Sequence, residues 1–157
     1  MIACCLLAIT LALGVALTPS RHLVVQSDDD SIAICRRVAE GERVDLEFTN
    51  SMFGGIVRES FLVSGDSLTR IGFWTELAAA AEYYAWTMPV EASDAGFEVV
   101  VARESFSSVP VLVDPVGEYQ LIVDDNEFGL SGKIDAPTSV VIEVESSMLI
   151  SGWLEGC

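Results

Sequence analysis

Residues 43–73, which read RVDLEFTNSMFGGIVRESFLVSGDSLTRIGF, decide the fold of this chain. In residues 43–49 apolar and polar side chains alternate, which is the pattern of a strand with one buried face. Residues 56–63 and 68–73 are apolar runs joined by the glycine-containing connection SGDS, and this arrangement predicts a β-hairpin. The stretch therefore indicates a β protein.

The strand pattern continues on both sides of this stretch. Before it, residues 23–26 and 31–38 are strand candidates separated by the acidic turn 28–30. After it, turn residues separate further candidates about every 8 to 12 positions, namely residues 97–103, 109–113, 119–123, 139–145 and 148–153. Many short strands of this spacing are typical of a sandwich or a barrel. We expect a single, mostly β, antiparallel domain of sandwich or barrel form with one short helix.

The expected helix lies in residues 74–86, where the strand pattern stops. The alanine-rich residues 77–82 favour a helix, Thr75 is its candidate cap, and Pro89 follows its end. An irregular loop fastened by aromatic side chains is the alternative. The aromatic residues either form a small core of their own or line an apolar pocket or a membrane interface; they are Trp74, Tyr83, Tyr84 and Trp86.

The charge balance is strongly acidic, with 24 acidic and 8 basic residues and a formal net charge of −16. A field of this sign repels nucleic acids and anionic lipid headgroups, so we expect no nucleic-acid partner. The acidic residues are spread from Asp28 to Glu155 without forming a block. This distribution favours adaptation to high salt, as in a halophilic protein, over an acidic patch for cationic partners or divalent ions.

The N-terminal residues 2–18 carry no charge and are almost all apolar. As a helix they span about 26 Å, against about 30 Å for the hydrocarbon core of a membrane. This length lies between those of a signal sequence and a transmembrane helix, so residues 1–20 are predicted to be one or the other, with a buried core helix as the alternative. Residues 21–157 then form an extracytoplasmic domain, either exported or held on the outer side of the cytoplasmic membrane.

Residues that carry catalytic or metal chemistry are scarce. His22 is the single histidine and no C-x-x-C motif occurs, which argues against a Cys/His zinc site and a Ser-His-Asp triad. We therefore expect no enzyme activity, no cofactor and no metal, with calcium at the acidic turns 28–30 and 124–127 as the alternative. Cys35 and Cys157 are the cysteines of the extracytoplasmic part, and one disulfide between them is possible there.

Residues 48–51, FTNS, followed by residues 57–63, VRESFLV, resemble a family of unknown function encoded beside TRAP-type solute transporters, especially those with TAXI-type binding proteins. Members of that family show an aromatic-Thr-His-Ser segment, then Val-x-Glu-x-aromatic-x-Val, then a Gly/Asp turn and a second strand. The resemblance covers residues 23–123. The family's histidine is Asn50 here, and alanine-rich residues 77–81 stand where the family has Gly-Ala-Gly. Asparagine retains hydrogen bonding at this position but not acid–base chemistry.

The resemblance implies a non-catalytic accessory protein of a solute uptake transporter, whose partners are transporter subunits or the solute-binding protein. A small extracytoplasmic ligand-binding module is the alternative, and an enzyme of unrecognised type is the third hypothesis. By position, the resemblance gives four candidate residues, which either contact a ligand or fasten a structural corner between two strands. These residues are Thr49, Asn50, Ser51 and Glu59.

Overall fold

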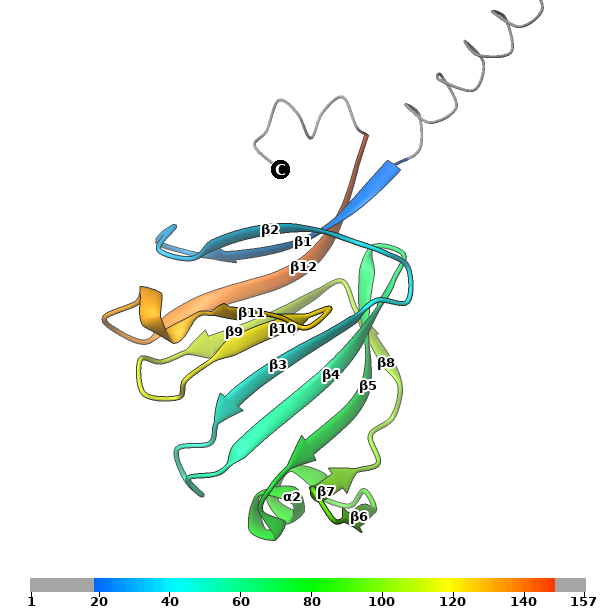
Figure 1. The fold of residues 1–157 in the computed structure, drawn as a ribbon, viewed down its shortest axis with the longest axis vertical. Helices are drawn as coiled ribbons and strands as arrows, with labels where there is room; N and C mark the ends of the chain where they lie inside the picture. Colours follow the sequence, from blue (N-terminus) through cyan, green and yellow to red (C-terminus); the bar gives the residue numbers. More distant parts are fainter. Residues whose placement is uncertain (1–18, 149–157) are drawn as a thin grey trace, which may run out of the picture.

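The computed structural model describes residues 19–148 as a mostly β domain made of two antiparallel sheets. The smaller sheet has the strand order β2-β1-β12-β9. Its strands are β1 (Pro19–Ser27), β2 (Ala33–Val38), β12 (Thr138–Met148) and β9 (Ser108–Val113). The expectation of a mostly β antiparallel domain with one short α-helix is confirmed for these residues (Figure 1).

The larger sheet has the order β11-β10-β3-β4-β5-β7-β6, and β8 also pairs with β5. The three long strands at its centre are β3 (Arg43–Thr49), β4 (Ile56–Ser64) and β5 (Ser67–Thr75). They correspond to the strands predicted from residues 43–73. Shorter strands and two helical segments complete the fold: α2 (Ala78–Ala85), β6 (Val90–Ser93), β7 (Gly96–Val99), β8 (Glu104–Phe106), β10 (Gln120–Val123), β11 (Asn126–Gly129) and the 3-10 turn η1 (Ser131–Lys133).

The helix is shorter than predicted because β5 continues through Trp74 and Thr75, which pair with β4. Thr75 is not the helix cap. Its hydroxyl instead donates to the carbonyl oxygen of Ile56 at 2.7 Å, and the N-cap position is Leu77, whose side chain makes no capping hydrogen bond. The predicted strand over residues 97–103 is present only at residues 97–99, in β7, and residues 100–103 lie in no strand. β7 pairs with the end of β5 at Phe73–Thr75, whereas β8 pairs with its start at Leu68–Arg70.

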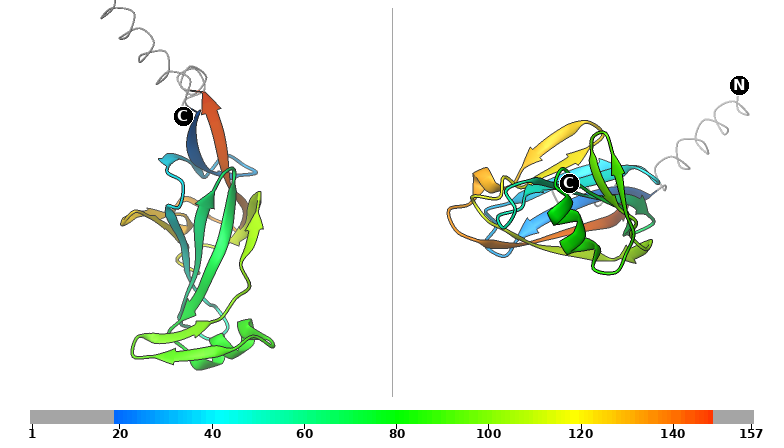
Figure 2. Two further views of the ribbon diagram at one scale, coloured as in Figure 1. Left: turned by 90° about the vertical axis from the view of Figure 1, so that its right-hand side faces the viewer. Right: turned by 90° about the horizontal axis from the view of Figure 1, so that it is seen from below.

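Two hydrophobic cores lie on the inner face of the larger sheet. The inter-sheet core packs this face against the smaller sheet and includes Leu23, Phe61, Leu68, Leu121 and Ile142. The helix core packs the same face against α2 and contains Val57, Phe73, Ala81, Ala85 and Val99. The long strands β3, β4 and β5 run from beside the smaller sheet to the end of the molecule where α2 lies (Figures 1 and 2). Burial of each large apolar side chain contributes about 1.5–3 kcal/mol.

The first and last described strands meet at the end of the molecule opposite α2. Pro19 of β1 pairs with Met148 of β12, so the chain enters and leaves the described fold at the same place (Figure 1). The predicted N-terminal hydrophobic helix and the possible partner of Cys35, Cys157, lie outside the described residues. No helix within residues 19–148 is long and apolar enough to span a bilayer.

Candidate functional site

Asn50 lies directly after β3, and its side chain closes the turn to β4. Its Oδ1 accepts hydrogen bonds from the backbone N–H groups of Met52 at 2.9 Å and Phe53 at 3.0 Å. Its Nδ2 donates to the hydroxyl of Tyr84 on α2 at 2.8 Å. Both acceptor positions and one of the two donors are thus used inside the fold. The buried side chain forms an Asx turn and fastens that turn to the helix.

The neighbouring candidates lie on either side of this buried corner. The Thr49 hydroxyl donates to Glu118 Oε2 at 3.3 Å, and its backbone N–H donates to the Gly117 carbonyl oxygen at 2.6 Å. Ser51 is exposed in the turn. The fourth candidate, Glu59, lies on the inner face of β4, paired with Leu46 and Phe73 rather than with the corner. The structure therefore brings three candidates together at the corner and places Glu59 apart from them.

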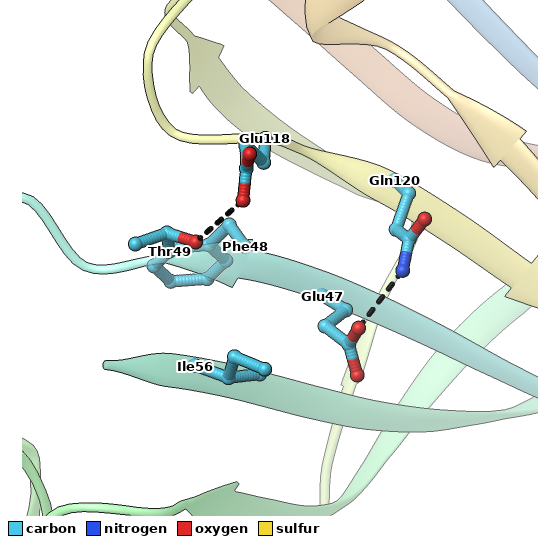
Figure 3. Close-up of a pocket in the computed structure, with 6 residues that line it drawn as sticks. All are labelled: Glu47, Phe48, Thr49, Ile56, Glu118 and Gln120. Carbon is cyan, nitrogen blue, oxygen red and sulfur yellow. Dashed lines mark hydrogen bonds between the residues drawn. The ribbon is translucent and has the colours of Figure 1, made fainter. Parts of the chain in front are cut away.

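A hollow of about 260 Å³ adjoins this corner (Figure 3). Its polar side chains are already joined in pairs. Gln120 Nε2 donates to Glu47 Oε1 at 2.8 Å, and Glu47 Oε2 accepts a hydrogen bond from Arg58 Nε at 2.9 Å. Together with the Thr49–Glu118 bond, these contacts connect β3 to the neighbouring segments. The polar side chains around the hollow therefore have a structural role. Its lining residues are Glu47, Phe48, Thr49, Ile56, Glu118 and Gln120.

A second hollow, here called the Glu59 cleft, has a volume of about 120 Å³ and lies on the inner face between the two cores. On β4, Glu59 lies between Val57 of the helix core and Phe61 of the inter-sheet core. Side chains two apart along a strand share a face, so all three point inward. The cleft is lined by Glu59, Phe61, Arg70, Phe106, Val109 and Pro110.

Glu59 is half-buried in this cleft, and within the described residues its carboxylate receives no hydrogen bond. Burial raises the pKa of Glu59, and the nearby Arg70 guanidinium opposes the increase without cancelling it. Burial is also the main cause of the raised pKa of Tyr84, which the charge of Glu59 raises further while the hydrogen bond from Asn50 lowers it. Tyr84 therefore connects the corner to the cleft electrostatically.

Arg70 provides the positive charge of the cleft. Its Nη2 donates to Glu104 Oε2 across β5 and β8 at 3.3 Å, and its guanidinium lies 5.5 Å from the centre of the Phe106 ring. Its Nε is buried and has no hydrogen-bond acceptor among the described residues. The cleft is thus lined by a carboxylate that receives no hydrogen bond, by the Arg70 guanidinium and by apolar walls, whereas the unused Nε–H of Arg70 is buried away from solvent.

A third feature is an exposed apolar surface at the α2 end, here called the tip and defined by Met52, Tyr83 and Trp86. These side chains are 67%, 57% and 89% exposed. The ring of Tyr83 lies 5.8 Å from that of Phe53, which holds the β3–β4 turn beside the helix. Single exposed apolar residues are common on protein surfaces, whereas large contiguous apolar patches are typical of contact surfaces.

Trp86 also occupies a strained backbone position. It follows the last residue of α2 with φ 55° and ψ −87°, a conformation that non-glycine residues rarely adopt. Such strain costs on the order of 1–3 kcal/mol and is concentrated at functional sites. The Trp86 side chain is exposed and belongs to neither core.

The acidic turns 28–30 and 124–127 are the alternative calcium sites. Within residues 19–148, no group of three or more His, Cys, Asp or Glu side chains is placed to hold a metal ion. In the turn between β1 and β2, the Asp29 carboxylate accepts hydrogen bonds from the hydroxyls of Ser31 at 2.6 Å and Ser27 at 2.7 Å. These bonds, with that of Ser31 largest, lower the pKa of Asp29 to about 2.

Sequence reasoning did not identify Arg70 or Phe106 as site residues. A signal for Arg70 was present, because the alternation of residues 68–73 places this arginine on the same face as buried Leu68. Phe106 reaches the cleft only because β8 returns to pair with β5, and this pairing is not visible in the sequence. Comparison of the chain with protein-family models, curated proteins and solved structures finds no match.

Proposed function

We propose that this protein is a non-catalytic extracytoplasmic accessory protein of a TRAP-type solute uptake transporter, and that its tip contacts the transporter's solute-binding protein. The transporter class comes from the resemblance of residues 48–63 to the family described above. The observation that carries the interaction role is the exposed and strained Trp86, together with Tyr83 and Met52. Aromatic residues of this kind provide much of the binding energy in protein interfaces.

The position of the tip supports a soluble partner over a membrane-embedded one. Pro19 and Met148 lie side by side at the opposite end of the fold from α2 (Figure 1). If residues 2–18 anchor the chain in the membrane, the tip projects away from the bilayer and faces the soluble components of the transporter. A solute-binding protein meets these conditions, whereas the membrane subunits of the transporter lie at the other end.

The interior beneath the aromatic residues also favours the interaction role. The Tyr84 ring packs 4.5 Å from the Phe73 ring, and Ala81, Ala85 and Val99 fill the space around them. The corner at Asn50 uses its hydrogen bonds internally. Because this core is filled and the Asn50 side chain makes its hydrogen bonds within the fold, we interpret the region beneath the tip as a rigid support rather than a binding cavity.

Affinity capture from host cells tests this proposal. The tagged full chain is recovered at high salt from gently solubilised membranes together with the periplasmic fraction. We expect the solute-binding protein to be recovered with the wild type but not with Trp86→Ser. Leu112→Ser is the matched control, because Leu112 is 66% exposed on β9, away from the tip.

Two results of this capture contradict the proposal. One is recovery of the wild-type chain alone when the transporter proteins are present in the input. The other is equal recovery of the partner with Trp86→Ser and with the wild type. If membrane subunits are recovered without the solute-binding protein, the accessory role is supported. The proposal that the tip contacts the solute-binding protein is then contradicted.

A second candidate function, a small ligand-binding module, is favoured by the Glu59 cleft. This cleft combines apolar walls with the Arg70 guanidinium and with the Glu59 carboxylate, which receives no hydrogen bond within the described residues. Ligand-binding pockets of drug-sized molecules measure about 300–1,000 Å³. The 120 Å³ of this cleft therefore restricts any ligand to a very small molecule.

A further inference from the structure

We infer that residues 149–157 fold back over the outer face of the smaller sheet and are fastened there by a disulfide between Cys157 and Cys35. The outer face is the one that points away from the inter-sheet core. Cys35 of β2 is disulfide-bonded, and the other cysteines of the chain are Cys4, Cys5 and Cys157. The inference concerns the end of the molecule opposite the tip, so it does not depend on the transporter contact.

Part of the outer face is covered, although the larger sheet packs against the other face. Ser20 and His22 of β1 are each only 8% exposed. They alternate with Leu23 of the inter-sheet core, so their side chains point to the outer face. The residues directly opposite His22 on the two neighbouring strands, Arg37 and Glu145, are nevertheless exposed. The neighbouring strands therefore do not account for the burial, whereas a segment that crosses β1 at these two positions does.

The path from Met148 to Cys35 crosses β1 at these two positions. Met148 pairs with Pro19 at the start of β1. Cys35 pairs with Val24, five positions further along β1, and two strand spacings separate it from β12. At about 3.4 Å per residue and about 4.8 Å between strands, the separation is about 20 Å. Residues 149–157 span up to about 30 Å when extended, so they reach Cys35 with length left for a change of direction.

A hollow of about 360 Å³ beside Cys35 accepts apolar side chains of this segment. The hollow is lined by Val24, Val25, Gln26, Ala33, Ile34 and Cys35. Trp153 and Leu154 precede Cys157 by four and three residues. A disulfide to Cys35 therefore brings both side chains close to the hollow. Their burial removes apolar surface from water, which favours the folded-back position of the segment.

The covalent step is a thiol–disulfide exchange in an oxidising compartment. The sulfur atoms of Cys35 and Cys157 form one bond, and their two protons and two electrons reduce the disulfide of an extracytoplasmic thiol oxidase to two thiols. Cys35 is exposed on the edge strand β2, so such an oxidase can reach it. Cys4 and Cys5 lie in the predicted signal sequence or membrane anchor, where removal or the bilayer keeps them from this reaction.

Peptide mapping of the full chain tests the pairing. The protein is recovered from host cells with free thiols blocked, denatured, and digested with trypsin without reduction. Trypsin cleaves after arginine and lysine, so the three groups of cysteines fall in the separate peptides 1–21, 22–36 and 134–157. We expect mass spectrometry to find peptide 22–36 linked to peptide 134–157. A link to peptide 1–21, a link between two copies of peptide 22–36, or an unlinked peptide 22–36 overturns the inference.

The single histidine reports whether the segment covers the outer face. Diethyl pyrocarbonate modifies accessible imidazole rings, and His22 is the only histidine of the chain. We expect slow modification in the oxidised wild type. After reduction, or in Cys157→Ser, the protection should be lost and the rate should approach that of the chain unfolded in urea. The double variant Cys4→Ser/Cys5→Ser is the matched control and should protect His22 as the wild type does. Undiminished protection in both reduced wild type and Cys157→Ser overturns the covering of this face.

Thermal unfolding measures the strength of the cross-link. We expect Cys35→Ser and Cys157→Ser each to lower the melting temperature by about 5–15 °C. The double variant of these two cysteines should melt no lower than either single variant, because the two residues act as one unit. The Cys4→Ser/Cys5→Ser control should melt with the wild type. If the serine variants do not fold, reduction of the folded wild type supplies the same comparison, and an unchanged melting temperature overturns the inference.

Discussion

At the scale of single residues, Asn50 holds the corner between β3 and β4 together. Replacement of Asn50 by alanine leaves two backbone N–H groups and the Tyr84 hydroxyl without their partner. We expect the free energy of unfolding to fall by about 1–3 kcal/mol, as measured by urea denaturation. Ser51→Ala is the control in the same turn, because Ser51 is exposed, and it should change stability by less than about 0.5 kcal/mol. A decrease below about 0.5 kcal/mol in Asn50→Ala contradicts the structural role of this corner.

Glu59 makes the stability of the protein depend on pH in a defined direction. Its pKa is raised in the folded state, mainly by burial, so folding favours the protonated form. This contribution is complete below the ordinary pKa of glutamate and is lost as the pH rises through the raised folded value. Glutamine resembles the protonated side chain. We therefore expect Glu59→Gln to melt at a higher temperature than the wild type at neutral pH.

The difference between Glu59→Gln and the wild type should disappear in acid, where both side chains are neutral. Melting curves at several pH values for both proteins measure this change. If Glu59→Gln is less stable than the wild type at neutral pH, the carboxylate is stabilised by contacts stronger than the burial that raises its pKa.

At the scale of structural elements, a substitution at the end of α2 can test the partner contact without lowering the stability of the fold. Trp86 has a positive φ, which glycine adopts without steric cost, and its side chain is 89% exposed. We expect the free energy of unfolding of Trp86→Gly to equal that of the wild type or to exceed it by up to about 1 kcal/mol. Glycine relieves the backbone strain, and the side chain that is removed lies largely in solvent. The same variant should fail to capture the partner. Urea denaturation and affinity capture measure the two effects, and a large decrease in stability contradicts the account.

Some elements follow from the sequence alone and others depend on tertiary pairing. β3 was predicted at its observed bounds because apolar and polar side chains alternate without interruption in residues 43–49. β11 was missed because its four residues are too short and polar to show a pattern. Its hairpin depends on Asp124 and Asp125, both with positive φ. Two-residue hairpin turns with positive φ usually contain glycine at one of these positions. Because glycine is absent here, residues 124 and 125 predicted a turn but not a hairpin.

The candidate site residues were also only partly predictable from the sequence. The sequence identified Asn50 and Glu59, but their separate surroundings depend on α2 and β8, which reach them from later parts of the chain. Tyr84 meets Asn50 from a distance of 34 residues along the sequence. Local patterns carry no information about which strands or helices meet across that separation, and this explains why Arg70, Phe106 and Met52 were not assigned to sites.

At the scale of the whole molecule, we expect the strongly acidic composition to make the stability of the protein depend on salt. A formal net charge of −16 on a single domain produces self-repulsion that counterions screen over about 10 Å at 0.1 M and about 3 Å at 1 M. We expect the melting temperature to rise between dilute buffer and molar potassium chloride, as followed by circular dichroism. Equal melting temperatures in the two buffers contradict adaptation to high salt.

The direct test of the central claim is site-specific photo-crosslinking in intact host cells. A photoreactive amino acid replaces Tyr83 at the tip in one strain and Leu112 on β9 in another, since both side chains are exposed. The account predicts that the Tyr83 position forms a covalent adduct with the solute-binding protein of a TRAP-type transporter, whereas the Leu112 position does not. If the Tyr83 position forms no adduct with that protein, or both positions form it equally, the tip is not the contact surface.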